Sequence, residues 1–464
     1  MLFRRFMATA ATTAKTHTSD IVIIGGGPAG LTLASAIKNS PILKNLKIKL
    51  VEGGNLIEPL EKFNESPPAN FMNRVVSLTP ATISYLKEIK AWDHFKEERT
   101  ETYDNIYAYD GITNARIQFD CPEIATMCEN FNIQSGLFQR IKELNKDNVE
   151  NPLEILDKTK VIEIKSDEKN KWPVLQLSTG DSIKTRLLVG CDGYNSPARK
   201  FAGIESRGWA YNRWGIVATL KYKDDAFRFP TGWQRFLTSG PLAQLPLPDN
   251  WCSLVWSTTP ELADILMKLP EEKFVAMVNA GAKLAPSEME YLYKLAAKND
   301  ETLMEEISWR LNLFNSKLKE EEYENYPLEI ESIVPNSRGR FPLKLSHADT
   351  YVEERVALVG DAAHTTHPLA GQGLNMGQGD VKSLVKVLET STERGLDIGS
   401  KFALEGYFSE RYPANHVLLG IVDKIHKIYS TDSSLLVMAR SLGLDAINNT
   451  PFLKDFMVSQ ISNK

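Results

Sequence analysis

Four short, mainly apolar runs recur along the chain, at residues 21–24, 47–51, 186–190 and 356–359, and each predicts a buried strand. Continuous apolar runs of this length are typical of parallel strands that are covered on both faces. Glycine-rich or polar turns follow the runs, and helical patterns follow the first and the last of them. We therefore expect an α/β fold in which distant segments build one largely parallel sheet.

The turn after the first run carries a nucleotide-binding pattern. Gly25, Gly27 and Gly30 fit G-x-G-x-x-G between that strand and a helix expected at residues 31–38, where backbone N–H groups at the start of a helix bind a pyrophosphate. Glu52 follows the second run, about 20 residues later, where a carboxylate can accept hydrogen bonds from ribose hydroxyls. Because its charge would repel a 2′-phosphate, the pattern favours FAD or NAD over NADP. An isolated glycine pattern would indicate only a loop.

The fourth run leads to Asp361 and then to a loop with Pro368, Gly371 and Gly373, and a second helix begins near Asn375. The start of a helix leaves backbone N–H groups unpaired and carries about half a positive charge. Glycines there let a flat or phosphorylated ligand approach the main chain. This segment is therefore a second candidate site for an anionic ligand.

A third motif, Asp192-Gly193, follows the run at residues 186–190. Alone it would be typical of a hairpin turn, but here Ser196 and Arg199 follow it and it lies between the other two motifs along the chain. In this order and at these separations, the three motifs resemble those of the class A, single-component flavin monooxygenases.

Within that superfamily the chain is most similar to the ubiquinone-biosynthesis hydroxylases, and among these to the mitochondrial ones. The resemblance covers most of the chain and extends to residues 74–78, Ala91-Trp92, Glu129-Asn130, Gln134, Leu137, residues 440–444, Pro451 and Lys454. It implies a p-hydroxybenzoate hydroxylase-like α/β fold, with a discontinuous Rossmann-like FAD-binding domain, an antiparallel-sheet substrate domain and C-terminal helices. The expected segments are 1–19 for a mitochondrial transit peptide, 20–100, 121–205 and 340–400 for FAD binding, 101–120 and 206–339 for the substrate domain, and 401–464 for the C-terminal helices.

The resemblance also implies an activity. In this family reduced FAD reacts with O₂ to give a C4a-hydroperoxide, whose distal oxygen attacks an electron-rich ring. The expected substrate is a polyprenylated 4-hydroxybenzoate-type precursor of ubiquinone (coenzyme Q), hydroxylated at C5. Electrons would come from NAD(P)H directly, or from a ferredoxin and its reductase. Other ubiquinone-biosynthesis proteins are expected partners, and the matrix side of the mitochondrial inner membrane is the expected location.

Because the flavin would carry the reaction, no side chain is assigned as catalytic. The residues expected to bind the cofactor are Gly25, Gly27, Gly30, Glu52, Arg74, Gln134, Asp192, Asp361, Pro368, Gly371, Gly373 and Asn375. Arg199 is expected to hold the Asp-Gly loop together with Asp192. Arg213 and Arg235 are candidates for substrate contacts.

Charge and composition narrow the picture further. The chain of 464 residues has a formal net charge of −5 and no Lys- or Arg-rich run, which argues against a nucleic-acid partner. No apolar stretch is long enough to predict a membrane span. Residues 1–19 contain three basic residues, six Ser or Thr and no acidic residue, as transit peptides do. A disordered N-terminus without a targeting role is the alternative.

Cysteine and histidine spacing adds no metal or disulfide framework. Cys121, Cys128, Cys191 and Cys252 lack C-x-x-C spacing, and we expect reduced thiols in packing positions. His364 and His367 are three residues apart, which raises the question of a metal site. Without a nearby carboxylate or cysteine cluster, structural roles are the better interpretation.

The remaining segments predict a substrate domain and a helical end. Residues 103–120 carry a hairpin signal around Asp110-Gly111, and residues 211–257 supply further strands. Residues 260–328 predict a helical insertion, whose exposed face is either solvated charge or a contact surface for partner enzymes. Residues 417–427 combine an apolar run with basic neighbours, which indicates a packed helix or, alternatively, contact with a membrane surface.

Two other functions share these motifs. Another FAD-dependent oxidoreductase of the same fold, such as a reductase or a halogenase, would carry the same nucleotide signature, although the W-x-W-x-I-P stretch typical of halogenases does not occur. A flavoprotein that serves as a scaffold subunit of a biosynthetic complex is the second alternative.

Overall fold

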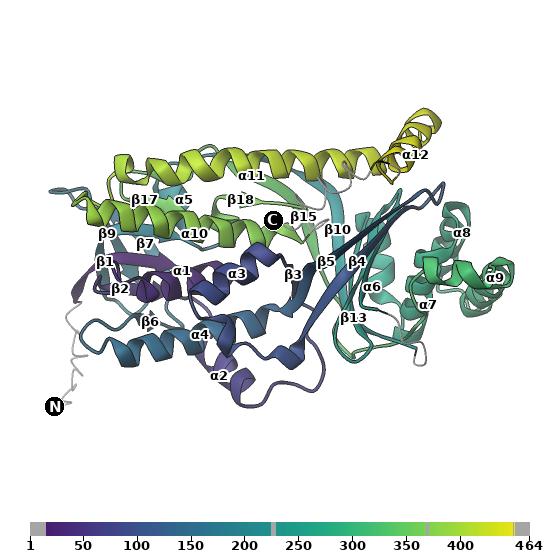
Figure 1. Ribbon diagram of the computed structural model, residues 1–464, viewed down its shortest axis with the longest axis horizontal. Coiled ribbons are helices and arrows are strands. Elements are labelled where there is room, and N and C mark those ends of the chain that lie inside the picture. Colours follow the sequence, from purple (N-terminus) through teal and green to yellow (C-terminus); the bar gives the residue numbers. More distant parts are fainter. Residues whose placement is uncertain (1–14, 224–228, 368–370, 449, 451–464) are drawn as a thin grey trace, which may run out of the picture.

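The computed structural model describes residues 15–223, 229–367, 371–448 and 450. It confirms the expected α/β architecture, with two sheets that follow one another along the long axis of the molecule (Figure 1). Pro368, Pro451 and Lys454, which the sequence singles out, lie outside the described residues. The same is true of the expected leader up to residue 14.

The first sheet contains eight strands, six of them in the order β16-β17-β9-β1-β2-β6. Their bounds are Val352–Glu353 (β16), Val356–Leu358 (β17), Ser182–Gly190 (β9), Thr16–Ile24 (β1), Ile48–Val51 (β2) and Glu154–Leu156 (β6), and β8 (Pro173–Leu177) and β7 (Val161–Ser166) continue the sheet beside β9. Strands β17, β9, β1, β2 and β6 are parallel. The four apolar runs of the sequence are neighbouring strands of this sheet.

The carboxyl ends of these strands lie level with one another. Ile24 at the end of β1 pairs with both Val51 and Gly190, and Gly190 pairs in turn with Leu358. The loops that follow β2, β1, β9 and β17 therefore leave the sheet side by side at one edge. In open parallel sheets this edge is where ligands bind.

Seven helices pack around this sheet: α1 (Pro28–Asn39), α2 (Ile57–Glu65), α3 (Pro80–Glu88), α4 (Asn130–Asp147), α5 (Pro197–Phe201), α10 (Gln372–Glu393) and α11 (Lys401–Tyr429). Helix α1 packs between α4 and α10, and α11 covers α10 (Figure 1). Pro28 at the first position of α1 has a backbone angle suited to a helix start. Leu31, Leu33 and Ile37 of this helix are fully buried in the sheet's core.

Strand β1 begins earlier than the sequence indicates. Thr16 pairs with Ser182, so residues 16–19 of the expected leader belong to the central sheet. The polar side chains of this stretch give no apolar signal, because they lie near the amino edge, where three of the first four are exposed. A cleavable leader that spares this strand would have to end before Thr16.

The second sheet has ten strands, nine of them in the order β18-β15-β10-β13-β12-β11-β4-β5-β3, with β14 beside β10. The bounds are Val75–Leu78 (β3), Thr100–Asp110 (β4), Arg116–Glu129 (β5), Ser206–Tyr222 (β10), Thr231–Leu237 (β11), Gly240–Pro246 (β12), Trp251–Thr258 (β13), Ile330–Ile333 (β14), Gly339–Ala348 (β15) and His364–Thr365 (β18). The hairpin expected at Asp110-Gly111 is confirmed as β4 and β5.

Membership of this sheet differs from the expected domain segments in four places. Strand β3, the second half of β5, strand β15 and strand β18 pair within the second sheet, although they fall in the ranges expected for FAD binding. Strands β5 and β10 are 14 and 17 residues long, and both pair within the second sheet. Sequence patterns show that such strands exist, but only their hydrogen-bond partners decide which sheet they join.

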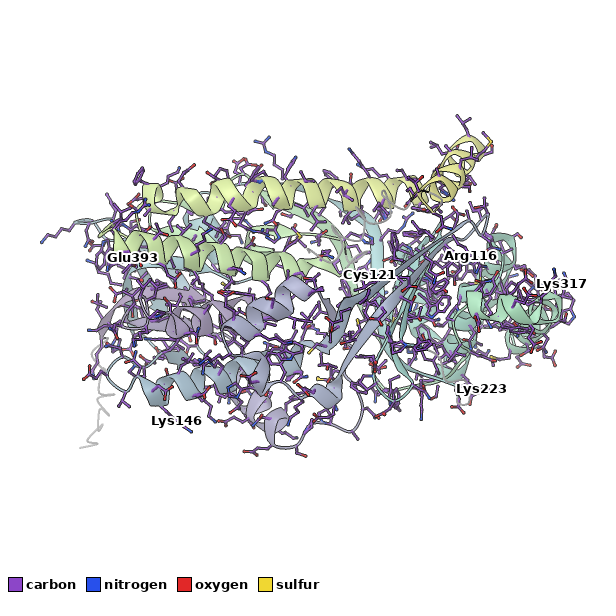
Figure 2. The ribbon with its side chains drawn as sticks, viewed as in Figure 1. Arg116, Cys121, Lys146, Lys223, Lys317 and Glu393 are labelled. Atoms are coloured by element: carbon purple, nitrogen blue, oxygen red, sulfur yellow. The ribbon has the colours of Figure 1, made fainter. Side chains whose placement is uncertain are left out.

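Helices α6 (Pro260–Lys268) and α7 (Glu271–Lys283) pack against the second sheet, and α8 (Pro286–Ala297) and α9 (Leu303–Lys317) pack against these two helices. They lie between residues 260 and 328, where the sequence predicts helices. Trp256 of the sheet and Phe274 of α7 are fully buried in the core between them. Figure 2 shows Lys317 at the end of the molecule opposite Glu393, which ends α10, so the insertion lies far from the first sheet.

Helix α12 (Ser434–Asn448) continues from α11 and reaches the tip of the β4–β5 hairpin (Figure 1). Arg440 forms a buried ion pair with Asp110 at that tip and donates to the carbonyls of Ile428 and Thr431. This contact ties the C-terminal helices to the second sheet. Within the described part of the chain, no helix combines the length and the apolarity needed to cross a bilayer.

Candidate functional site

Two glycines of the first motif are required by close packing. Gly25 has φ +106°, and a Cβ on it would lie 2.2 Å from the carbonyl oxygen of Cys191. A Cβ on Gly30 would lie 2.0 Å from the carbonyl oxygen of Gly25. These contacts bring the first motif against the segment that begins the Asp-Gly motif, and the backbone positions exclude any side chain.

Gly27 differs from its neighbours, because a Cβ there would meet no protein atom within 4 Å. It is the N-cap of α1, and no side chain accepts a hydrogen bond from the first turn of that helix. Its backbone, at φ −69° and ψ 178°, suits any residue. The open space therefore faces uncapped N–H groups and the positive end of the helix dipole, which is the environment a phosphate requires.

Glu52 and Gln134 both form hydrogen bonds with the backbone of Gly26, which lies between Gly25 and Gly27. The Glu52 carboxylate accepts from the N–H groups of Gly26 (2.7 Å) and Gly54 (2.6 Å). Gln134, in the first turn of α4, donates from Nε2 to the Gly26 carbonyl at 3.0 Å. The two backbone bonds orient the carboxylate and leave acceptor capacity for a ligand, since an ionised carboxylate has about four lone-pair sites.

The Asp-Gly motif forms a turn that is closed by its own side chains. Asp192 accepts from the N–H of Ala198 at 3.0 Å, and burial raises the pKa of its carboxyl group. Ser196 caps α5 by accepting from the N–H of Arg199 at 2.9 Å. Gly193 has φ +78°, a conformation that favours glycine. The hairpin interpretation is thus wrong for this Asp-Gly pair, which connects β9 to a helix.

Arg199 links the second motif to the third. Its buried guanidinium donates to the carbonyls of Ala362 (2.7 Å) and Tyr194 (2.6 Å). Residue 362 belongs to the single turn of 3-10 helix η4 (Gly360–Ala362) that follows β17. The bond explains why an arginine at this position holds the loops together, as expected from the resemblance.

Asp361 lies in η4 with its side chain accessible to water, and no described residue donates a hydrogen bond to its carboxylate. Surrounding protein nevertheless desolvates this group and raises its pKa. Accessibility combined with desolvation is the condition of a group on the wall of a narrow crevice. The neighbouring Gly360, at φ +61°, packs against Ala29 of α1, so η4 lies directly beside the glycine motif.

The start of α10 forms the last part of the candidate site at the carboxyl edge of the first sheet. Gly371 is its N-cap at φ +60°, and no side chain caps this helix. The Asn375 side chain is buried and fully used: it donates to the carbonyls of Ser77 and Gly371 and accepts from the N–H of Thr79 and the hydroxyl of Thr82. Any contact of Asn375 with a cofactor would therefore come from its backbone.

Three further candidates take different places. Gly373 follows Gly371 in the first turn of α10, and a Cβ on it would lie 3.6 Å from Thr366. Arg74 precedes β3 with an exposed side chain that has no hydrogen bond or ion pair among the described residues. Arg235 is buried and donates to the carbonyls of Gly281 and Gly111 within the second sheet region. The two terminal nitrogens of Arg235 are therefore used in hydrogen bonds within the fold.

A buried polar network, which was not predicted from the sequence, lies behind η4. Asp380 of α10 is completely buried and accepts from Gly360 N–H (3.2 Å), His364 Nε2 (2.5 Å), Arg411 Nε (3.0 Å) and Asn415 Nδ2 (2.9 Å). Burial alone would raise the pKa of Asp380, but these partners lower it to about 2. The sequence contained one signal for this network, which is the presence of a carboxylate among the apolar residues of the inner face of α10.

His364 thus has a structural role, as the sequence predicts, in a bond with Asp380. Among the described residues there is no group of three or more side chains suited to a metal ion.

Together the segments form one elongated site along the carboxyl edge of the first sheet. It has two uncapped helix starts, α1 and α10, and two acidic side chains, Glu52 and Asp361, with the glycine main chain between them. The uncapped helix starts suit phosphates, and the acidic residues suit ribose or ribityl hydroxyls. The residues present fit a dinucleotide such as FAD.

Comparison with known proteins agrees with this geometry. The family described as "FAD binding domain" matches residues 18–227 and 257–416. The mitochondrial ubiquinone biosynthesis monooxygenase COQ6 of Saccharomyces cerevisiae is 46% identical over 472 residues, covering 99% of this chain and 98% of that protein. Its human counterpart is 35% identical over 442 residues, covering 94% and 91%.

Solved structures show the same fold at low identity. p-Nitrophenol 4-monooxygenase PnpA from Pseudomonas putida superimposes with a TM-score of 0.66 at 14% identity, covering 97% of this chain and 99% of that one. PqsL from Pseudomonas aeruginosa gives 0.64 at 17% identity, covering 93% and 100%. The fold is p-hydroxybenzoate hydroxylase-like, as expected. The chain therefore belongs to the class A flavin monooxygenases, in the group of the ubiquinone biosynthesis monooxygenases, and it is an FAD-dependent enzyme.

Proposed function

We propose that this enzyme adds a hydroxyl group at C5 of the aromatic ring of a polyprenylated 4-hydroxybenzoate-type precursor of ubiquinone. The observation that carries this proposal is the meeting of three distant loops at one edge of the sheet, in a chain 46% identical over nearly its whole length to a ubiquinone biosynthesis monooxygenase. The bound flavin would supply oxygen activation, through its C4a-hydroperoxide. The protein would bind, orient and enclose the reactants.

The start of α10 is the part of the chain suited to hold the flavin ring. Its uncapped N–H groups and helix dipole would stabilise negative charge near N1 and the C2 oxygen of the reduced ring. A Cβ on Gly371 would lie 3.5 Å from Ser77, which belongs to β3 and whose hydroxyl is hydrogen-bonded to Tyr103 at 2.7 Å. The second sheet therefore reaches this helix start and could roof a dry substrate pocket, as oxygen transfer requires.

A product assay with isotopic oxygen tests this function. Holoenzyme supplied with a prenylated 4-hydroxybenzoate and ¹⁸O₂ should yield a ring with one added, labelled oxygen at C5. One arm of the assay provides NADPH alone, and a second provides NADPH with ferredoxin and ferredoxin reductase. The arm that gives product, and that bleaches the flavin in stopped flow, identifies the electron donor.

The same assay separates the alternatives. Product without the label, or flavin turnover with chemistry other than ring oxygenation, would favour another oxidoreductase of this fold. Full flavin occupancy with no reaction in either arm would favour a scaffold subunit. Addition at another ring carbon would retain the hydroxylase and correct the position.

We also propose that the enzyme resides in mitochondria, on the matrix side of the inner membrane and bound to its surface. Its relatives are named as mitochondrial, and residues 1–14 retain two of the three basic residues of the transit-peptide signal. Other ubiquinone-biosynthesis proteins are the proposed partners. The exposed Trp309, Tyr291 and Leu313 of α8 and α9 offer a contact surface for them.

The face proposed to touch the membrane lies on α11 and α12, at the outer side of the molecule (Figure 1). It combines exposed apolar and cationic side chains: Val417, Ile421, Lys424, Lys427, Ile428, Leu435, Leu436, Met438 and Leu442. Of the two acidic residues between positions 417 and 442, Asp423 is buried and Asp432 is exposed. In a chain of net charge −5, this combination suits the surface of an anionic bilayer.

Removal of apolar area from this face should weaken membrane binding. The double variant Leu435→Glu/Leu442→Glu removes side chains that are 71% and 61% exposed, so the fold should persist while partitioning to cardiolipin-containing vesicles falls roughly tenfold or more. Flotation of the holoenzyme measures this. Trp309→Glu/Tyr291→Glu makes the same charge change on α8 and α9 and should leave flotation unchanged; equal loss in both variants would contradict the proposed face.

A further inference from the structure

Helix α12 follows a short link, and the end of α11 before that link is anchored. Tyr429, the last residue of α11, stacks on Phe236 of β11 with ring centroids 3.9 Å apart and an interplanar angle of 20°. Only residues 430–433 separate Tyr429 from Ser434, where α12 begins. A change in the direction of α12 therefore needs new backbone angles only in this link, as in hinge motions.

Few contacts hold α12 against the second sheet. Val437 and Arg440 are the only buried residues among its described side chains. Leu444 and Ile447 are partly buried against an apolar cluster that includes residues of β4 and β5. Between the helix and the hairpin tip lies an open groove of about 420 Å³, whose apolar lining consists of Ile112, Val437, Met438 and Leu442. Because the packing is incomplete here, little contact is lost when the helix moves away.

The buried ion pair between Arg440 and Asp110 specifies the position of α12. Asp110 is completely buried, and its Oδ1 accepts from the N–H groups of Ile112 (2.7 Å) and Thr113 (3.1 Å), so the hairpin tip orients the carboxylate for the guanidinium. Both charges lose water in this position and would regain it if α12 moved away. Since desolvation offsets the attraction, such a pair fixes a geometry without adding much net stability.

The surface under α12 leads to the candidate flavin site. The cluster that Leu444 and Ile447 contact contains Tyr103 of β4, whose hydroxyl is hydrogen-bonded to Ser77 at 2.7 Å. Ser77 lies beside Gly371 at the start of α10, where we expect the flavin ring. A continuous series of contacts thus connects the inner side of α12 to the proposed site of the reaction.

The outer side of α12 belongs to the face proposed to touch the membrane (Figure 1). Leu435 and Leu442 there are 71% and 61% exposed. Burial of this apolar area in a bilayer would stabilise the helix at the membrane surface. The bilayer would therefore compete with the few contacts that hold α12 on the sheet.

We propose that α12 is a hinged cover over the second sheet, held closed by Arg440 and Asp110, and that contact with a membrane opens it. Opening would bring the apolar surface under α12 next to the bilayer, from which a polyprenylated ring has to enter. This rests on the proposed function, because that function makes the substrate a membrane lipid. In the closed position the cover would help to exclude water from the reaction site.

A reversible disulfide tests the cover. Thr113 Oγ1 on the hairpin tip and Ser441 Oγ on α12 lie 2.8 Å apart, so Thr113→Cys/Ser441→Cys should form a disulfide that locks α12 closed. Holoenzyme is mixed with phosphatidylcholine–cardiolipin vesicles that carry polyprenylated 4-hydroxybenzoate, and the flavin absorbance change reports binding of the ring. We expect the disulfide to slow binding about tenfold or more, and dithiothreitol to restore the wild-type rate.

Thr16→Cys/Ser182→Cys is the matched control, because these hydroxyls lie 3.2 Å apart between β1 and β9, at the other end of the molecule from α12 (Figure 1). Its disulfide should leave the binding rate unchanged. Equal rates in the oxidised and reduced forms of Thr113→Cys/Ser441→Cys would overturn the proposal, even if the ring is hydroxylated. A ring that binds but is not hydroxylated would contradict only the proposed function.

The same cysteine pair tests opening by the membrane without any substrate. If vesicles separate α12 from the hairpin tip, their addition before the oxidant should slow formation of the Thr113→Cys/Ser441→Cys disulfide, measured by mass spectrometry. Disulfide formation in the Thr16→Cys/Ser182→Cys control should not respond to vesicles. An equal response of the two pairs would contradict opening at the membrane.

Arg440→Gln should have the opposite effect to the lock, because it removes the ion pair. Amides of residues 434–448 should then exchange with deuterated water about tenfold faster or more in the absence of vesicles. Arg310→Gln removes an ion pair with Glu306 on α9 instead and should leave the exchange of α12 unchanged. Wild-type exchange of α12 in Arg440→Gln would show that the ion pair does not hold the cover closed.

Discussion

Replacement of Gly27 by valine should give a folded protein without flavin. The backbone of Gly27 suits any residue, and a Cβ there would meet no protein atom within 4 Å, so the polypeptide tolerates the change. The added side chain would instead occupy the space in front of the uncapped start of α1. We expect FAD affinity to fall about 100-fold or more, as the loss of charge-assisted hydrogen bonds to a pyrophosphate requires.

Absorbance of the purified variant near the flavin bands, and its melting curve with and without FAD, measure this. Gly30→Ala is the informative contrast, since its Cβ would lie 2.0 Å from the Gly25 carbonyl oxygen and the backbone cannot yield. That variant should lose the fold together with the flavin. A Gly27→Val protein that purifies yellow would show that the pyrophosphate does not bind at α1.

Loss of the Asp380 charge should be among the most destabilising single changes in the chain. Asp380→Asn keeps the shape but leaves the partly buried Arg411 and the fully buried His364 without their carboxylate. Removal of one partner of a buried ion pair typically costs about 3–5 kcal/mol. The change also weakens the support of Gly360, whose N–H donates to Asp380. We expect a large fall in the unfolding midpoint in urea and partial loss of FAD.

The pH dependence of this variant gives a second test. The pKa of Asp380 is lowered from 3.8 to about 2 in the folded protein, so its carboxylate stabilises the fold above about pH 4. That contribution is lost as the pH falls from about 4 to 2. The difference in stability between wild type and Asp380→Asn should therefore be constant near neutrality and should narrow in this acidic window.

The surface pair Lys294–Glu290 of α8 provides the control. Glu290→Gln should leave the midpoint unchanged, because exposed ion pairs contribute little. If Asp380→Asn is as mild as this control, the network behind η4 does not support the cofactor edge.

Local pattern was sufficient for the elements that we propose bind the nucleotide. Gly25, Gly30 and the strand before them follow from steric limits on glycine and from continuous apolar burial, which are properties of neighbouring residues. The same is true of the hairpin at Asp110-Gly111 and of the helices between residues 260 and 328. The expectation that three distant motifs meet depended on the resemblance, and the register of the four parallel strands shows how they meet.

Long-range contacts decided what the sequence by itself left open. Asn375 fits the cofactor pattern, yet its side chain is hydrogen-bonded to Ser77 and Thr82. Asp380 belongs to no motif, yet it accepts a hydrogen bond from Gly360 at the start of the third motif. The bulge in β10 that places Tyr211 against His426 depends on where β15 pairs, about 130 residues away. The sequence alone determined the strands, turns and glycine positions, because these depend on near neighbours. Only the tertiary structure determined which buried polar groups form hydrogen bonds and ion pairs with one another, because these partners are brought together by packing.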